Sequence, residues 1–250
     1  MRRLTILFLL LISPCLYAQE VGLQFEQANE AYRHGDYQKA IGLYQQVIKN
    51  GYESPAIYYN LGNAYFKSND IPSSILFYER ARRLAPGDDD IAYNLRLANL
   101  RVVDKIEPVP QVIFIRWWNG IEQSFSSDGW AVFVIVCVWA VIAAGLVFFL
   151  FRSFTVKRLS LFAVALCVIL VVFGFYSMVH QYQYEQSANS GIVFSPTVSV
   201  KSAPDEKSTD LSVIHEGVKV DLLDIVGTWR KIRLADGKIG WLSQEDVQII

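Results

Sequence analysis

The sequence predicts a membrane protein of several domains: an all-α solenoid, a two-helix transmembrane hairpin and a small all-β barrel. Three observations carry this prediction. Residues 22–100 repeat with a period of 34, two long uncharged apolar runs follow, and the C-terminal part alternates short apolar strands with turn residues. The formal net charge of −1 argues against a nucleic-acid binder, which normally shows a basic face.

The N-terminus is typical of a secretory signal. Two arginines precede a short apolar core, and Ala18 offers a small residue before a cleavage point, so residues 1–18 are predicted to be a signal peptide. The alternative is a lipoprotein signal in which Cys15 is acylated. That alternative requires a small residue where Pro14 stands.

The helical repeat is visible as aligned segments. Residues 28–32 align with 62–66, residues 35–37 align with 69–71, and a third copy begins at Ile91 and stops after one helix. A 34-residue period with small residues where two helices cross is typical of the tetratricopeptide repeat, and residues 20–105 resemble that family. Because two full repeats are followed by a lone helix, we expect that helix to cap the array.

The resemblance implies a groove, lined by the inner helix of each pair, that binds extended peptides. Asparagines occupy equivalent positions on these helices, and an amide can donate to and accept from a peptide backbone at once. Two basic residues form a further equivalent pair that would favour acidic ligands. The candidate peptide-binding residues are Asn29, Asn60, Asn63, Asn94, Arg33 and Lys67. The alternative is that the asparagines cap turns or face solvent.

Residues 108–129 are predicted to connect the repeats to the membrane. This stretch is apolar and aromatic, but it is too short and too polar to span a bilayer. Trp117, Trp118 and Trp130 suit the membrane interface, so we expect an interfacial helix here. The alternative is an ordinary lead-in to the first span.

The two apolar runs, residues 130–151 and 159–180, are each long enough to cross the hydrocarbon core, which takes about 20 residues in a helix. The intervening loop, residues 152–158, carries three basic residues and no acid, so we expect it in the cytoplasm. Both flanking domains would then be periplasmic. The one histidine, His180, stands at the end of the second run, and inside the runs no ionisable residue marks an ion path, which favours an anchor. Gly145 and Gly174 would allow close contact between the helices.

The pattern of residues 188–250 predicts short strands with turns between them. A Val-Lys-Ser-Ala-Pro segment, a Glu-Gly before a Val-x-Val strand, and an Asp-Gly turn leading to Trp241 together resemble a bacterial SH3-like domain. Such domains bind cell-wall peptides or protein segments with aromatics on one face. Trp229 and Trp241 are the candidate ligand-binding residues. The alternative role for both is core packing, which a small barrel needs.

Catalytic and metal-binding patterns are lacking in the sequence. The three histidines are scattered, one cysteine lies in the signal and two lie in the apolar runs, and no phosphate-binding glycine loop occurs. We therefore expect no enzyme, no metal site and no cofactor.

The order of parts resembles the BatE-type aerotolerance proteins: signal, tetratricopeptide array, hairpin with a basic loop, SH3-like tail. That resemblance implies a scaffold in the bacterial inner membrane, with von Willebrand A-domain membrane proteins and other products of an aerotolerance operon as partners. The lipid bilayer is a further partner, and nucleic acid is not. The alternative function is a cell-wall sensor or anchor whose tail binds peptidoglycan.

Overall fold

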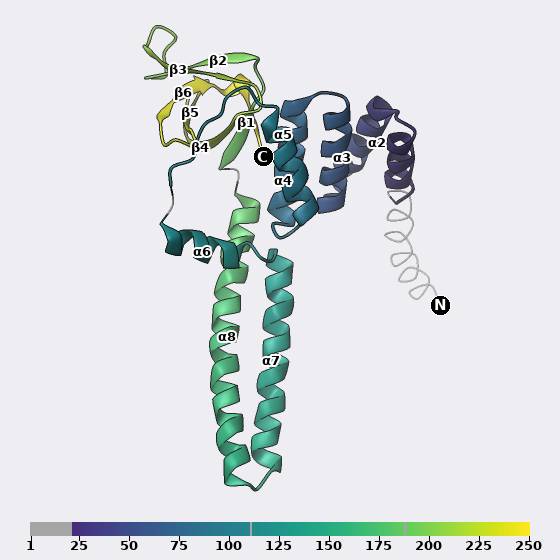
Figure 1. Cartoon of the computed structure of the whole chain (residues 1–250), viewed down its shortest axis with the longest axis vertical. Coiled ribbons are helices and arrows are strands. Elements are labelled where there is room, and N and C mark those ends of the chain that lie inside the picture. Colours follow the sequence, from purple (N-terminus) through teal and green to yellow (C-terminus); the bar gives the residue numbers. More distant parts are fainter. Residues whose placement is uncertain (1–21, 111, 188) are drawn as a thin grey trace, which may run out of the picture. The chain divides into compact units, whose positions relative to one another are not determined.

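A computed structural model of the chain describes residues 22–110, 112–187 and 189–250. The predicted signal peptide lies outside the described residues. The chain divides into two compact units. One unit holds the repeated helices and the C-terminal sheet, and the other holds one short and two long helices (Figure 1).

The repeated helices form two pairs followed by a single helix. Residues 22–33 are helical, and the remaining helices are α2 (Tyr37–Lys49), α3 (Pro55–Lys67), α4 (Ile71–Leu84) and α5 (Asp89–Leu100). Capping residues begin three of them, and at the start of α4 Asp70 accepts the Ser73 amide at 3.1 Å. The Ser54 side chain accepts the Ile57 amide at the start of α3, where Pro55 stands at the first helical position. Asp88 accepts two amides at the start of α5.

The turn within each pair needs one residue with a positive φ. Gly35 has φ of 84°, and Asn69, at the equivalent position of the next repeat, has φ of 67°. Asn69 is the one non-glycine residue with positive φ in the described part of the chain, and asparagine tolerates this conformation better than most side chains. The repeat therefore keeps the backbone geometry although the residue differs.

The core of the repeats pairs a small residue with a tyrosine. Tyr44 and Tyr78 are 1% exposed and occupy equivalent positions in successive repeats. A Cβ at Gly62 would stand 2.6 Å from the Tyr78 ring, so only glycine lets the two helices approach this closely. Ala28, the equivalent of Gly62, is also fully buried. Small and large residues therefore alternate across the helix contacts, as the sequence predicted.

The C-terminal part is one seven-stranded antiparallel sheet with the order β3-β2-β6-β5-β4-β1-β7. The strands are β1 (Ser190–Val193), β2 (Thr197–Lys201), β3 (Asp210–His215), β4 (Lys219–Val226), β5 (Trp229–Arg233), β6 (Ile239–Ser243) and β7 (Val247–Ile249). Its core is aliphatic: Ile192, Val193, Val200, Ile214, Val220, Ile232 and Leu242 are buried. Gly237, with φ of 88°, makes the predicted turn between β5 and β6.

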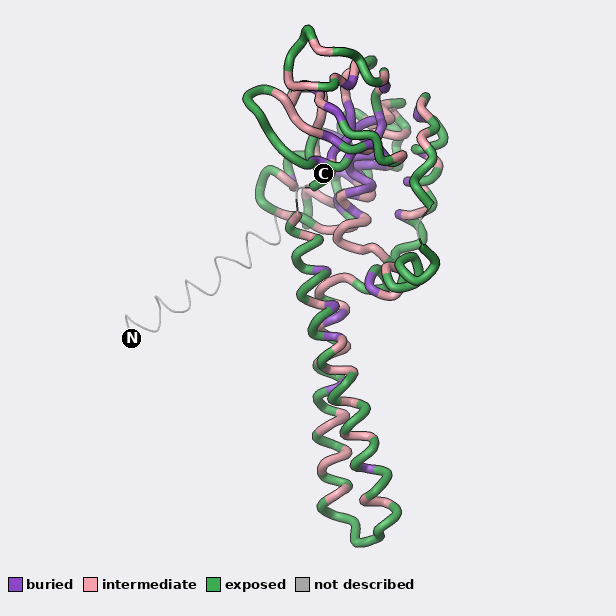
Figure 2. Tube along the Cα trace, turned by 90° about the vertical axis from the view of Figure 1, so that its left-hand side faces the viewer, coloured by how far each residue is buried: buried purple, intermediate pink, exposed green. Residues whose placement is uncertain are grey.

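The second unit contains α7 (Ser127–Leu150) and α8 (Phe154–Gln186), which are joined by a short connection and lie side by side (Figure 1). Both helices are long and apolar enough to cross a membrane, and most of their length is exposed or half-buried (Figure 2). This is compatible with a two-pass membrane protein. Lys157 and Arg158 lie in the first turns of α8 rather than in a loop, since nothing in residues 154–158 breaks a helix.

The contact between α7 and α8 follows a seven-residue spacing. Ser160, Gly174, Ser177 and Gln181 are buried on α8, and Trp130 and Cys137 are buried on α7, so the buried positions recur every seven residues with Ser177 between two of them. A seven-residue period keeps one stripe of each helix facing its neighbour. A Cβ at Gly174 would stand 2.8 Å from the Phe133 ring, whereas one at Gly145 would meet nothing within 4 Å. Gly174 thus permits close contact as predicted, and Gly145 does not take part.

Helix α6 (Ile113–Glu122) lies across the upper end of the pair formed by α7 and α8 (Figure 1). The Trp118 ring packs edge-on against Phe173 of α8, and the Trp130 indole donates to the Glu122 carbonyl. Glu122 is buried, and its carboxylate lies 3.4 Å from His180. Most apolar side chains of α6 are exposed, namely Ile113, Phe114, Ile115, Trp117 and Trp118. An interfacial position for this helix remains a prediction.

Candidate functional site

The repeat region contains a pocket of about 290 Å³. Residues from the first helix and from α3, α4 and α5 contribute to its walls. They are Tyr32, Tyr59, Asn63, Phe66, Lys67, Tyr78, Asn94 and Leu97. The pocket therefore combines an aromatic lining with two amides and one cation.

The pocket contains three of the six predicted residues: Asn63, Asn94 and Lys67. Their positions follow from helix geometry. Asn63 and Lys67 are one helical turn apart on α3 and so share one face, and Asn94 reaches the pocket from α5. The other three predicted residues, Asn29, Asn60 and Arg33, do not line it.

The asparagines form a hydrogen-bond network that repeats with the helices. Asn63 Oδ1 accepts from the Tyr78 hydroxyl at 2.6 Å and from Asn94 Nδ2 at 3.0 Å. One repeat earlier, Asn29 Oδ1 accepts from the Tyr44 hydroxyl at 2.6 Å and from Asn60 Nδ2 at 3.0 Å. The same roles thus recur in successive repeats, and they hold neighbouring helices together.

This network leaves one donor group of Asn63 unused, on a residue that lines the pocket. Because both bonds go to the Asn63 carbonyl oxygen, the side chain is fixed and its Nδ2 group is left over. Among the described residues, Asn63 Nδ2 has no hydrogen-bond partner. A peptide carbonyl is the natural acceptor for such an amide. The asparagines therefore do recur along the helices, but most of their hydrogen-bonding atoms are already paired within the protein.

The tyrosines of the network remain protonated. Burial raises the pKa of the Tyr44 hydroxyl to about 12, and burial also raises the pKa of Tyr78. Both hydroxyls therefore donate to their asparagines throughout the neutral range. Burial likewise raises the pKa of Tyr32, which lines the pocket.

The charge in the pocket comes from Lys67, which is exposed at the C-terminal end of α3. A second cation contacts the pocket residue Phe66: the Arg101 guanidinium lies 5.8 Å from the centre of the Phe66 ring and donates to Asn69 Oδ1 at 2.6 Å. A long-range attraction for acidic groups follows from these two cations. Arg33 is exposed one repeat earlier and could extend the same basic surface.

Sequence reasoning missed the aromatic walls of the pocket. Tyr32 and Phe66 occupy equivalent positions in successive repeats, and both are half-buried and line the pocket. Tyr59 also lines the pocket, and its hydroxyl accepts from Asn94 Nδ2 at 2.8 Å. The available signal was the recurrence of aromatics at equivalent positions on the inner helices, which is the same signal that identified the asparagines.

The SH3-like sheet places both predicted tryptophans on one face. Trp241 of β6 pairs directly with Lys231 of β5, and Trp229 lies two residues from Lys231 on the same strand. Residues directly opposite, or two apart along a strand, point to the same side of a sheet. Both tryptophans are half-buried, and the sheet core is built without them. Trp241 therefore lies on the face away from the buried core, and not in the core, which was the alternative role considered for it.

Basic side chains surround the tryptophans. The Lys231 ammonium lies 5.7 Å from the centre of the Trp241 ring, a cation–π contact. Lys201 of β2 also pairs with Trp241 and forms an ion pair with Asp210 at 2.7 Å. This face therefore offers flat aromatic surface with cations beside it. The arrangement suits planar or sugar-like groups that carry a carboxylate.

The described residues contain no group of three metal-ligating side chains. Cys137 and Cys167 are free thiols within the helix pair. The functional features of the described chain are thus two surfaces for binding, one in each module.

Residues 25–89 match the tetratricopeptide repeat family, and residues 196–248 match the bacterial SH3 domain family. The chain joins two interaction modules. A 67-residue stretch is 37% identical to the BBSome complex member BBS4 of Bos taurus. That match covers 27% of this chain and 13% of the relative, so the similarity is confined to a small part of both proteins.

The fold class predicted from the sequence is confirmed: a helical tetratricopeptide region, two long apolar helices and an antiparallel SH3-like sheet are all present. Both modules belong to classes that bind other molecules without catalysis. Their presence indicates binding to proteins or to peptidoglycan.

Proposed function

We propose that this protein is a non-enzymatic scaffold of the bacterial inner membrane that displays both binding modules in the periplasm. The observation that carries the proposal is the pocket with Asn63, Asn94 and Lys67 on its walls. A fixed amide donor, aromatic walls and a lysine together suit an extended peptide with an acidic side chain. Because the amide contacts the backbone, recognition would depend little on the peptide sequence.

Membrane topology supports the display of both modules on one side. Arg152, Lys157 and Arg158 gather at the tip of the helix pair, and short basic segments stay in the cytoplasm. A chain that crosses twice has its two flanks on the opposite side. The exposed tryptophans of α6 at the other end suit the outer interface of that membrane. A reporter fused after Gln186 should therefore be periplasmic, and a cytoplasmic reporter would refute this topology.

The pocket is tested by site-specific crosslinking in intact cells. A photoreactive amino acid replaces Lys67 in one variant and Lys49 in the other. These lysines are matched, since each ends the helix in which it lies, but only Lys67 lines the pocket. Illumination should link an envelope protein to position 67 and not to position 49. Equal labelling at both positions, or none at either, contradicts a peptide-binding pocket.

The partners are proposed from the architecture, which resembles BatE-type aerotolerance proteins. We expect von Willebrand A-domain membrane proteins among those that co-purify from gently solubilised membranes. The similar protein BBS4 is a member of the BBSome complex, which accords with repeats used for assembly. Purification that recovers no A-domain protein and no other envelope protein would contradict the scaffold role.

The second candidate function is binding to peptidoglycan, which the half-exposed Trp229 and Trp241 favour. The full chain in detergent should sediment with purified sacculi, and Trp241→Ala should reduce the bound fraction. Trp139→Ala is the control, because Trp139 lies on α7 far along the chain from the sheet. Binding that is absent, or equally reduced by both changes, excludes this function for the aromatic face.

A further inference from the structure

The repeat array lacks its last helix. Residues 22–33 pair with α2 and α3 pairs with α4, but α5 has no second helix after it. In a solenoid each repeat covers the apolar face of its neighbour, so an array that stops here leaves one face uncovered. The sequence predicted that α5 itself would serve as the cap.

Helix α4 is buried on sides where its equivalent, α2, is exposed. Leu76 of α4 is 2% exposed, whereas Gly42, its equivalent on α2, is exposed. Residues 72–79 are all buried, including Ser73 and Glu79. Something other than the repeats must therefore cover part of this helix.

The turn between β3 and β4 of the SH3-like sheet lies against the end of the array. Gly217, with φ of 86°, occupies this turn. A Cβ at Gly217 would stand 3.0 Å from a methyl group of Val102 and 3.5 Å from one of Ile75. Val102 follows α5, Ile75 belongs to α4, and both are buried. The turn thus covers apolar surface that a further helix would otherwise cover.

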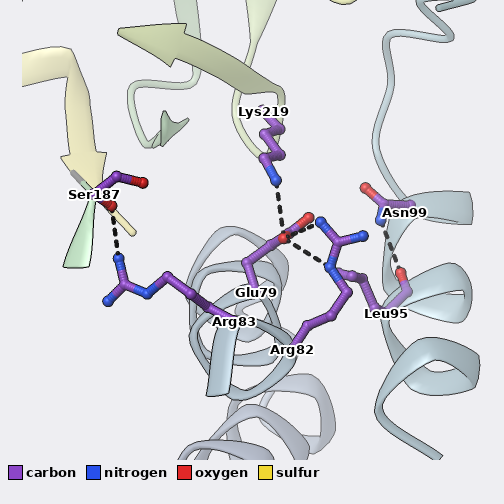
Figure 3. Close-up of polar contacts among 7 residues, drawn as sticks. All are labelled: Glu79, Arg82, Arg83, Leu95, Asn99, Ser187 and Lys219. Carbon is purple, nitrogen blue, oxygen red and sulfur yellow. Dashed lines mark hydrogen bonds and ion pairs between the residues drawn. The ribbon is translucent and has the colours of Figure 1, made fainter. Parts of the chain in front are cut away.

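A buried ion pair joins the same two surfaces. Lys219, the first residue of β4, donates to Glu79 Oε2 at 2.9 Å, and Arg82 donates to the same oxygen at 2.7 Å (Figure 3). Burial alone would raise the pKa of Glu79, but the charges of Lys219 and Arg82 outweigh burial and lower it. A buried carboxylate that lost Lys219 would be poorly compensated.

Further hydrogen bonds tie the chain after α5 to the sheet. Asp104 accepts from the His215 backbone amide at 2.6 Å and lies 3.1 Å from its ring nitrogen. The Val109 amide donates to the Ala235 carbonyl at 3.1 Å. At the other edge of the sheet, Arg80 donates to the carbonyl of Ile249 at 2.8 Å. These contacts join the repeat region to both edges of the sheet.

We infer that the SH3-like domain is the C-terminal cap of the repeat array and that it holds α4 and α5 in the positions that form the pocket. Three of the residues that line the pocket come from these two helices: Tyr78 from α4, and Asn94 and Leu97 from α5. Loss of the cap therefore loosens one side of the pocket while the first repeat stays intact. The two modules act as one body rather than as separate modules on a shared anchor.

Hydrogen exchange of the full chain in detergent micelles tests the inference. In Lys219→Met, amide exchange in α4 and α5 should rise about tenfold or more, because the buried Glu79 charge is then paired with Arg82 alone. Exchange in residues 22–49 and in α7 should not change. Lys231→Met is the matched control, since Lys231 lies on the tryptophan face and should leave α5 as it is.

Asp104→Ala removes an independent contact and should also raise exchange in α5. Unchanged exchange in α5 in both Lys219→Met and Asp104→Ala would overturn the inference, and so would an equal rise in Lys231→Met. The measurement needs no ligand. It can therefore fail while the pocket still binds a peptide, and it can succeed even if the proposed function is wrong.

Discussion

Two glycines within the repeat helices should respond in opposite ways to the same change. A Cβ at Gly62 would stand 2.6 Å from the ring of Tyr78, which is 1% exposed and is held through its hydroxyl by Asn63. A Cβ at Gly42 would meet nothing within 4 Å. Gly62→Ala therefore tests the close packing that forms the back of the pocket, and Gly42→Ala is its matched control.

The expected magnitudes follow from two opposing effects. Replacing glycine by alanine within a helix stabilises it by about 1 kcal/mol. Overpacking a full core costs about 1–3 kcal/mol. Because the Gly62 contact is well below an ordinary carbon–carbon distance, the cost should be near the upper end. We expect Gly62→Ala to lower the free energy of unfolding by about 1–2 kcal/mol and Gly42→Ala to raise it by about 0.5–1 kcal/mol.

Urea unfolding of the full chain in micelles, followed by far-ultraviolet circular dichroism, measures both changes. The apolar helix pair stays helical in detergent, so the signal change reports the soluble modules. Equal stabilisation by both substitutions would show that the Tyr78 ring yields to a methyl group. The packing assigned to Gly62 would then be wrong.

Three further outcomes are expected. Tyr78→Phe should lower the free energy of unfolding by about 0.5–1.5 kcal/mol, because Asn63 Oδ1 loses the hydroxyl that donates to it. The control Tyr93→Phe changes an exposed side chain and should be neutral in the same urea titration. The pKa of Glu79 is lowered in the folded protein, so the stability that its charge contributes is complete above the ordinary pKa of 4.5 and is lost as the pH falls below that value. The free energy of unfolding measured from pH 7 to pH 3 should show this loss, and the loss should be smaller in Glu79→Gln. Gly174→Ala should speed the separation of the two long helices in a denaturing detergent, and Gly145→Ala should not. Energy transfer between labelled helix ends measures both rates, and equal rates would contradict the close contact at Gly174.

The order and type of the domains could be predicted because each depends on a local pattern. The 34-residue period identifies helices that pack on their sequence neighbours, and uncharged runs identify helices that cannot be solvated. The Asp236-Gly237 turn specifies a hairpin within a few residues. Hydrophobic burial and backbone geometry decide these features, and both are encoded over short stretches of chain.

The candidate pocket could be predicted only in part. Asn63, Asn94 and Lys67 do lie together, because equivalent positions on stacked helices face the same groove. The sequence could not show that the carbonyl of Asn63 would be taken by Tyr78 and Asn94. Those bonds depend on how far one repeat is rotated against the next, which no single repeat specifies.

By itself, the amino-acid sequence determined three folded parts, their order along the chain and three of the polar side chains that line the repeat pocket. Tertiary structure alone decided that the SH3-like domain closes the repeat array. Glu79 looks like an ordinary helix-surface acid with a nearby arginine, and its second partner, Lys219, lies 140 residues away. Long-range pairing of this kind arises from surfaces that exist only after each domain has folded, so no local sequence pattern could predict it.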